Sequence, residues 1–168
     1  DLIDGMRGRA AAVHANLEAK IAREAGSSEA RRALWVHQNA VYGVRLSDSC
    51  GDVAGLEHWA GRLRENPLRD PTSQVPRAVA ARARWAAANR RWDEAVPLFE
   101  RLLPKLPDMD VMGQRADLTL RAAHAFLQVG RLDDAARAAA GVADRMLAEG
   151  TRGHALLCGP QVLRALAE

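Results

Sequence analysis

An internal repeat constrains this chain more than any other feature of its sequence. Three segments, each a turn followed by a helical pattern, superpose on one another and begin at Gly51, Arg90 and Gly130, which are 39 and 40 residues apart. In this register four columns hold only apolar residues: Val53, Trp92 and Leu132; Leu56, Ala95 and Ala135; Ala60, Phe99 and Ala139; Leu63, Leu102 and Val142. Such a period indicates stacked units that bury their apolar faces only against one another.

Apolar residues recur every three or four positions along most of the chain, which is the pattern of amphipathic helices. Glycine and proline separate these stretches, since Gly26, Gly130 and Gly150 follow helical patterns and Asn66-Pro67 ends another. Aromatic residues make up only 4% of the chain, and the abundant alanine favours closely packed helices over β-strands. We therefore expect an all-α protein of seven to eight helices.

The length of the chain is that of one domain. We predict a single helical repeat domain made of an N-terminal helix, three helix pairs and a C-terminal capping helix: residues 1–168, divided into 1–26, 28–66, 76–107, 109–149 and 151–168. Ser27 or Ser28, and later Asp52, should cap helix starts, because their side-chain oxygens accept hydrogen bonds from free backbone N–H groups. Gly159-Pro160 should divide the last helix into two short pieces.

The repeated turns resemble those of a known family. Asn-Arg-Arg-Trp-Asp-Glu-Ala at residues 89–95 and Val-Gly-Arg-Leu-Asp-Asp-Ala at residues 129–135 are similar to the turn of the tetratricopeptide repeat (TPR). The resemblance covers residues 75–150 and, more loosely, 35–67, and it includes Phe99, Leu102, Pro107, Ala122, Ala123 and Phe126. The period exceeds the usual length of about 34 residues, as in the longer repeats of bacterial regulatory and signalling proteins.

Some positions depart from the family's pattern. Leu56 stands where the family has a small alanine, Arg82 takes a usual leucine place, and Leu147 replaces the closing proline. A helical hairpin array of no particular family is therefore the alternative.

The resemblance implies a right-handed α-solenoid of antiparallel helix pairs, whose first helices line a concave groove that binds an extended peptide or a partner helix. Four small residues should let the paired helices approach closely: Ala83, Ala95, Ala123 and Ala135. The register of the family places the exposed, partner-binding positions at Gln38, Arg45, Arg77, Arg84, Asp117, His124 and Gln128.

Arginine predominates among these positions, and Arg77, Arg84 and Arg91 recur every seven residues. Guanidinium groups bind carboxylates through paired hydrogen bonds. We therefore expect a scaffold that binds a protein or peptide, with an acidic or C-terminal segment as the favoured form. An ordinary solvated arginine surface is the alternative.

No residue pattern indicates catalysis, a metal or a cofactor. The histidines form no metal-binding motif, the glycines form no phosphate-binding fingerprint, and Cys50 and Cys158 belong to no CxxC spacing. We expect a protein that is not an enzyme and has no cofactor, with structural roles for all five histidines: His14, His37, His58, His124 and His154.

Two other features also have structural explanations. The acid pairs Asp93/Glu94 and Asp133/Asp134 recur at the same place in the repeat, where they should stabilise helix N-termini. The tryptophans, among which Trp59 lies in an apolar stripe, are expected to fill the space between helices.

The charge of the chain disfavours a nucleic-acid partner. Arginine (22) and lysine (2) exceed the 21 acids by only three charges, and both signs are dispersed. The use of arginine in place of lysine is typical of GC-rich bacterial coding. No stretch reaches the length of a membrane span and no signal sequence is present, so we expect a cytoplasmic protein without membrane contact.

Two further functions remain alternatives, a nucleic-acid-binding helical array and a ligand-sensing segment of a larger regulator. The start at Asp1 instead of a methionine is consistent with a processed product or a piece of a longer protein.

Overall fold

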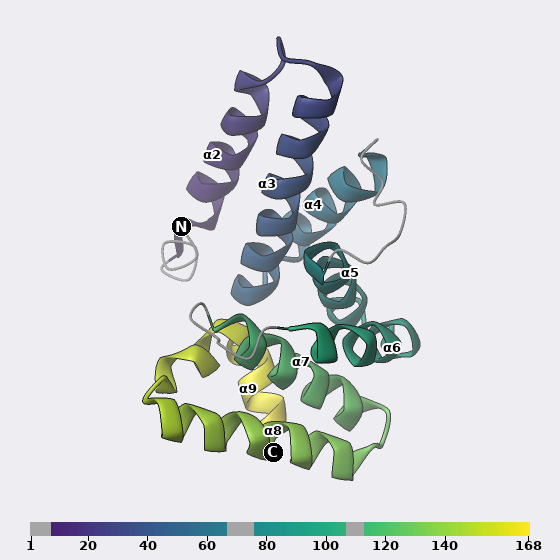
Figure 1. The fold of residues 1–168 in the computed structure, drawn as a ribbon, viewed down its shortest axis with the longest axis vertical. Helices are drawn as coiled ribbons and strands as arrows, with labels where there is room; N and C mark the ends of the chain where they lie inside the picture. Colours follow the sequence, from purple (N-terminus) through teal and green to yellow (C-terminus); the bar gives the residue numbers. More distant parts are fainter. Residues whose placement is uncertain (1–7, 67–75, 107–112) are drawn as a thin grey trace. The chain divides into compact units, whose positions relative to one another are not determined.

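The computed structural model describes residues 8–66, 76–106 and 113–168, and within these ranges the chain is helical, as predicted, without a strand (Figure 1). The elements are α2 (Ala10–Arg23), α3 (Glu29–Cys50), α4 (Val53–Glu65), α5 (Pro76–Ala88), α6 (Trp92–Leu102), η2 (Leu103–Lys105), α7 (Gln114–Gln128), α8 (Leu132–Glu149), η3 (Arg152–Cys158) and α9 (Pro160–Ala167). None of these helices combines the length and apolar character that crossing a membrane requires.

The chain divides into two compact units, Asp1–Ala81 (unit 1) and Arg82–Glu168 (unit 2). The division falls within α5, so the first turns of this helix belong to unit 1 and its last turns to unit 2. One continuous repeat domain over residues 1–168 stays a prediction.

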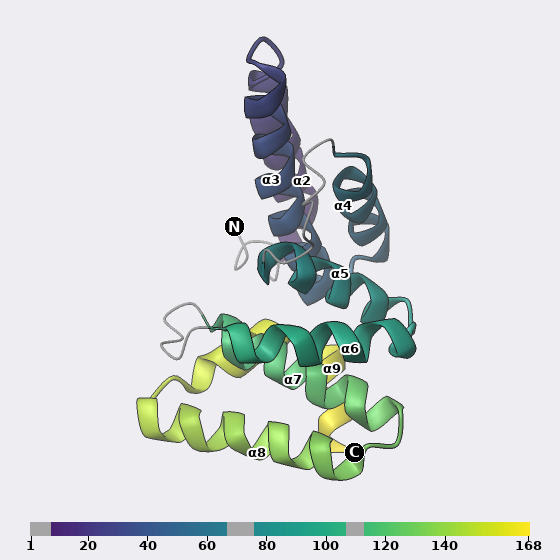
Figure 2. The ribbon, with the colours of Figure 1, turned by 45° about the vertical axis from the view of Figure 1, so that its right-hand side comes forward.

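Unit 1 is built around α3. Figures 1 and 2 show α2 and α4 alongside it, and both contact it. Each helix contributes a buried side chain that is at most 3% exposed: Leu17 from α2, Val44 from α3 and Trp59 from α4. A Cβ atom at Gly43 would lie 2.3 Å from the ring of Trp59, so the absence of a side chain at this position lets the indole pack directly on the backbone of α3.

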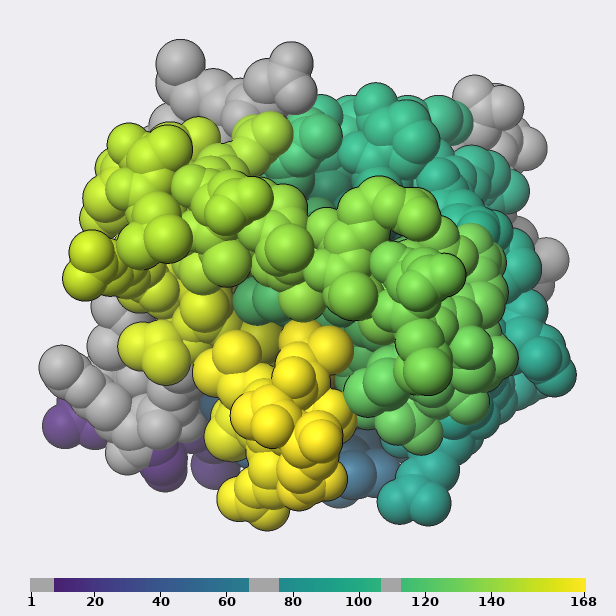
Figure 3. Space-filling view, turned by 90° about the horizontal axis from the view of Figure 1, so that it is seen from below, coloured from purple at the N-terminus to yellow at the C-terminus, as the bar shows by residue number. Residues whose placement is uncertain are grey.

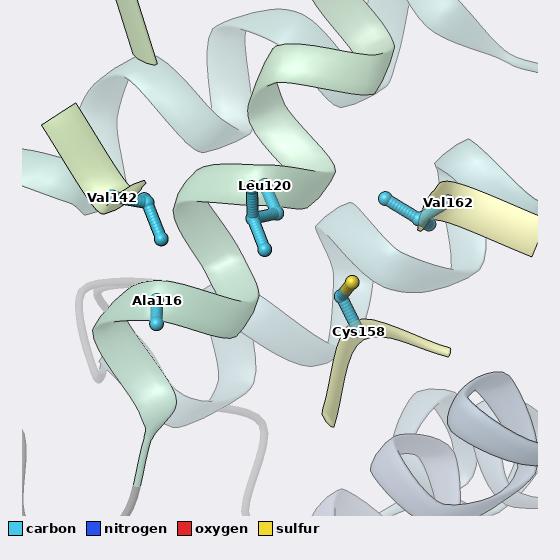
Figure 4. Packing of buried hydrophobic residues seen from close by; sticks show 5 residues of the cluster. All are labelled: Ala116, Leu120, Val142, Cys158 and Val162. Carbon is cyan, nitrogen blue, oxygen red and sulfur yellow. The ribbon is translucent and has the colours of Figure 1, made fainter. Parts of the chain in front are cut away.

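Unit 2 is built around α7, which contacts α6, α8, η3 and α9. Its apolar contacts include a cluster in which α7, α8, the end of η3 and α9 each contribute side chains: Ala116, Leu120, Val142, Cys158 and Val162 (Figure 4). Figure 3 shows the face of this unit that is formed by α8 and the C-terminal helix α9.

The three turns that the sequence repeat aligns have the same backbone geometry. Gly51, Arg90 and Gly130 all adopt a left-handed backbone conformation, with φ values of 71°, 56° and 77°. In each turn the next amide donates to the carbonyl five residues earlier: Asp52 to Ser47 at 2.8 Å, Arg91 to Ala86 at 2.8 Å and Arg131 to Phe126 at 2.9 Å. These bonds satisfy carbonyl groups that a helix end leaves free. Three helical hairpins therefore turn in the same way at equivalent positions.

Burial agrees fully with the second apolar column, agrees with the third and fourth except that Ala139 and Leu63 are only half-buried, and corrects the first. The second column, which includes Leu56 and Ala135, is buried throughout. In the first column Val53 is 67% and Leu132 is 62% exposed, and Trp92 is half-buried. The prediction of core positions there is wrong for Val53 and Leu132, each of which is the first residue of its helix and follows a turn whose left-handed glycine is exposed.

Other predictions from the sequence are confirmed. The four small residues expected between paired helices are at most 5% exposed: Ala83, Ala95, Ala123 and Ala135. Ser28 and Asp52 cap α3 and α4 by accepting hydrogen bonds from the amides of Arg31 and Gly55. The last helical stretch is divided at Gly159 into η3 and α9. Helix starts predicted within residues 1–7 and 107–112 lie outside the described residues.

The recurring acids lie in the first turns of α6 and α8, as expected, but the N-cap residues there are arginines without a capping hydrogen bond. Arg91 pairs with Glu94 and its guanidinium lies over Trp85, while Arg131 pairs with Asp134 and lies over Phe126. Each of these two hairpins therefore has an arginine at the equivalent position, which links the start of the second helix to an aromatic ring of the first helix.

Candidate functional site

The structure places the predicted partner-binding residues in three environments. Gln38, Arg77 and Gln128 are exposed, Arg45 and His124 are half-buried, and Arg84 and Asp117 are only 3% and 0% exposed. The expectation that all seven are exposed is therefore wrong for Arg84 and Asp117.

Arg84 and Asp117 belong to a buried charge cluster in unit 2. The carboxylate of Asp117 accepts a hydrogen bond from Nη2 of Arg84, and its second oxygen accepts one from Nε of Arg121 at 2.9 Å. Burial of charges is tolerated only when such pairing replaces the lost hydration. Arg121 was missed by sequence reasoning, although its position four residues after Asp117 on one helix was a usable signal. The cluster joins α5 to α7 within unit 2 and offers no exposed surface to a partner.

The remaining predicted positions of unit 2 lie one turn apart on α7. His124 packs edge-on against Trp92, with ring centroids 5.4 Å apart. Burial, and then the nearby charge of Arg121, lowers the pKa of His124. The imidazole is therefore neutral at neutral pH and can donate or accept a hydrogen bond beside exposed Gln128.

In unit 1 two predicted positions, Gln38 and Arg45, lie on the same face of α3 as Tyr42, which lines a hollow. Gln38, Tyr42 and Arg45 follow one another at helical spacing and so share a face of α3. Tyr42 lines a hollow of about 240 Å³ together with residues of α2 and the residue before it: Arg9, Ala12, Val13, Asn16, Leu17 and Lys20. The described lining contains two cations and no carboxylate. Because apolar and basic side chains line it together, the hollow suits a segment or small molecule that combines apolar and anionic groups.

Elsewhere on α2, His14 joins the three helices of unit 1. Its Nδ1 accepts a hydrogen bond from the indole Nε1 of Trp59 at 2.7 Å, and its Nε2 lies 2.9 Å from Oδ2 of Asp52. Since the indole nitrogen is only a donor, Nδ1 is unprotonated and Nε2 carries the hydrogen. The hydroxyl of Ser47 also lies 3.5 Å from Nε2.

Serine, histidine and aspartate thus meet at one place, but their arrangement differs from a catalytic triad. In a triad the serine and the acid contact opposite nitrogens of the imidazole, so that the acid orients the base. Here Ser47 and Asp52 both contact Nε2, while Trp59 occupies Nδ1. Ser47 is also fully buried. We therefore assign the cluster a structural role.

One helical turn further along α2, Glu18 joins α2 to α4. Its two carboxylate oxygens pair with Nε2 of His58 and Nη2 of Arg62, each at 2.6 Å. Partial burial raises the pKa of Glu18, but the hydrogen bonds from Arg62 and His58 outweigh this effect and the pKa is lowered. These two ion pairs therefore link α2 to α4.

Cys50 and Cys158 are free thiols, and burial raises the pKa of both, that of Cys158 to about 11. Neither is a thiolate at neutral pH, so neither is an activated nucleophile. In the described parts of the chain no three histidine, cysteine or acidic residues gather in a way that could hold a metal ion.

Comparison of the chain with protein-family models, with curated proteins and with solved structures finds no match. The resemblance to the TPR family therefore rests on the residues of this chain alone.

Proposed function

We propose that this protein is a scaffold of TPR-like helical hairpins that binds a partner protein through the first helices of its hairpins. The single observation that carries the proposal is the shared turn geometry at Gly51, Arg90 and Gly130. Hairpins that repeat in this way can stack side by side into a right-handed solenoid and present a row of equivalent helices to a partner.

The polar positions still exposed on first helices support a peptide or helix as the partner. Gln38 and Gln128 can bind backbone amides or side chains by hydrogen bonds, and Arg77 can bind a carboxylate. An exposed ion pair contributes only about 0–1 kcal/mol, so apolar contacts must supply much of the affinity. An acidic segment with apolar residues fits these requirements, as expected in a bacterial regulatory or signalling protein.

Charge reversal tests this surface. Arg77→Glu should weaken capture of a partner from a lysate of the source organism, whereas Arg137→Glu on the second helix α8, where the side chain is 75% exposed, should not. Arg84 is unsuitable because its reversal would place two carboxylates together in a buried cluster. Equal capture by the two variants would contradict the proposed surface.

Site-specific crosslinking tests the same binding surface by an independent measurement. A photoreactive residue at Gln38 or Gln128 should give a discrete adduct with the partner, and one at exposed Ala148 of α8 should not. Adducts of equal yield from all three positions would count against binding through the first helices.

The hollow in unit 1 favours a second candidate, a ligand-sensing segment of a larger regulator. A ligand that fills this space should raise the melting temperature in proportion to its concentration and affinity. Lys20→Glu should abolish the shift for an anionic ligand, because Lys20 lines the hollow. No shift with any member of a library of apolar carboxylic acids would reject this candidate.

A further inference from the structure

One exposed side of α8 is apolar along nearly its whole length. Leu132 and Leu147, near the two ends of the helix, are 62% and 61% exposed. Three exposed alanines lie between them at spacings of three or four residues, so that all five side chains share one side of the helix. We call these residues the α8 stripe: Leu132, Ala136, Ala140, Ala143 and Leu147. Figure 3 shows α8 at the surface of unit 2.

The α8 stripe is distinct from the side of the helix that packs on its own unit. Ala135 and Val142 are buried on that side, and Met146 packs against the cluster around Leu120. Alanine at an exposed helical position is explained by helix propensity alone. Two exposed leucines in line with the alanines are not, because together they form an apolar strip about 22 Å long at about 1.5 Å per residue. A contiguous apolar strip at the surface indicates contact with another molecule.

The order of side chains in the α8 stripe suits contact with a second copy of itself. Read from either end, the stripe is leucine, three alanines and leucine. In an antiparallel pair of α8 helices related by a two-fold axis, each contact occurs twice with the roles exchanged. Leu132 of one copy then faces Leu147 of the other, Ala136 faces Ala143, and Ala140 lies next to the axis. The alanines permit a close approach of the two helices, and the leucines cover both ends.

The charges beside the stripe favour the antiparallel arrangement. Arg137 and Asp144 lie along the same edge of the stripe, and both are exposed. Antiparallel pairing brings Arg137 of each copy close to Asp144 of the other, which gives two symmetric ion pairs. A parallel pair would place like charges opposite each other at both positions, which is repulsive. Arg137 also pairs with Asp134 of its own chain at 2.9 Å, and an exposed pair of this kind is weak.

We propose that the α8 stripe is a self-association surface, through which two copies of this chain form an antiparallel dimer with two-fold symmetry. This surface lies on the second helix of a hairpin, whereas the proposed partner surface lies on first helices. The dimer therefore presents two copies of the partner surface, and either proposal can fail without the other. A contact between two single helices is smaller than a standard interface, so the dimer should form in concentrated solution and separate on dilution.

Sedimentation velocity of the chain tests the dimer over concentrations from about 1 μM to about 1 mM. Leu147→Glu should weaken association about a hundredfold or more, because it places a carboxylate at both ends of the apolar contact. Leu132→Glu should act in the same way, because the two leucines face each other. The matched control is Leu34→Glu on α3, where the native side chain is 46% exposed, and it should leave association unchanged. A wild-type chain that is monomeric throughout, or a dimer that persists in both α8 variants, would overturn the proposal.

A charge exchange tests the orientation of the two helices. Arg137→Asp alone and Asp144→Arg alone each replace two ion pairs by two like-charge contacts, so each should weaken association about tenfold. The two changes combined exchange the charges and should restore the wild-type affinity. Both native side chains are exposed, so the variants should fold, which circular dichroism checks. Unchanged association in the single variants, or no recovery in the combined variant, would refute the antiparallel dimer.

Discussion

Removal of the Asp117 carboxylate should destabilise unit 2 strongly. Asp117 is fully buried and accepts hydrogen bonds from Arg84 and Arg121, which are 3% and 5% exposed. Each charge-assisted hydrogen bond contributes about 1.5–3 kcal/mol, and loss of one member of a buried ion pair typically costs about 3–5 kcal/mol because the partner charge stays buried. We expect Asp117→Ala to lower the free energy of unfolding by about 3–5 kcal/mol, measured by urea denaturation followed by circular dichroism.

The matched control is Asp144→Ala, which removes an exposed carboxylate of α8 and should change stability by less than about 0.5 kcal/mol. A triple variant that replaces Arg84, Asp117 and Arg121 by methionine, leucine and methionine should regain most of the loss, because no unpaired charge remains buried. A loss below about 1 kcal/mol in Asp117→Ala would show that the cluster is solvated, and would refute this reasoning.

Three further predictions concern packing and pH. Gly43→Ala should lower the free energy of unfolding by about 1–3 kcal/mol, because its Cβ would lie 2.3 Å from the ring of Trp59. The control Gly141→Ala in α8, which has open space around it, should raise that free energy by about 0.5–1 kcal/mol. Equal effects of the two variants in chemical denaturation would contradict the close approach. Ala135→Trp should cost about 1–3 kcal/mol because the site is 5% exposed, and unchanged stability would count against the pairing of α7 and α8. Burial raises the pKa of Cys158 to about 11, above the value of about 8.5 of an unfolded thiol, so the unfolded state loses its proton first and the free energy of unfolding should fall between about pH 8.5 and pH 11. Because the pKa of Cys50 is raised as well, Cys158→Ala should reduce that fall without abolishing it, in denaturation measured across this range.

Helix type and helix ends could be predicted from the sequence because local chemistry determines them. Ser28 and Asp52 cap helices through their own oxygens, and Gly51, Gly130 and Gly150 adopt the left-handed conformation that ends a helix. Both effects involve residues within one turn of each other, so the pattern of residue types was sufficient.

Burial of individual side chains was harder to predict, because it depends on contacts distant in sequence. Arg84 was expected at the surface from its place in the family's repeat register, yet Asp117, 33 residues later, pairs with it in the interior. Conversely, Leu132 was expected in the core from its type, but as the first residue of α8 it is 62% exposed. A column in a repeat alignment indicates equivalent positions and does not by itself establish burial.

The candidate sites depended even more on tertiary contacts. The sequence identified His14 as one of five histidines without a motif, and it gave no sign that the ring would lie between Trp59 and Asp52, 45 and 38 residues away. The hollow in unit 1 is lined by residues of two helices, α2 and α3, which periodicity predicts singly but does not place against each other.

The repeat itself can be tested most directly at Arg90, where the chain has a residue other than glycine in a left-handed conformation, with φ of 56°. The three-bond coupling between the amide and Hα, read together with the carbon chemical shifts, reports this angle in solution. Our account predicts a positive φ at Arg90, matching those at Gly51 and Gly130. A negative φ at Arg90, with α5 continuing as a helix into α6, would contradict the three equivalent hairpins on which the proposed scaffold depends.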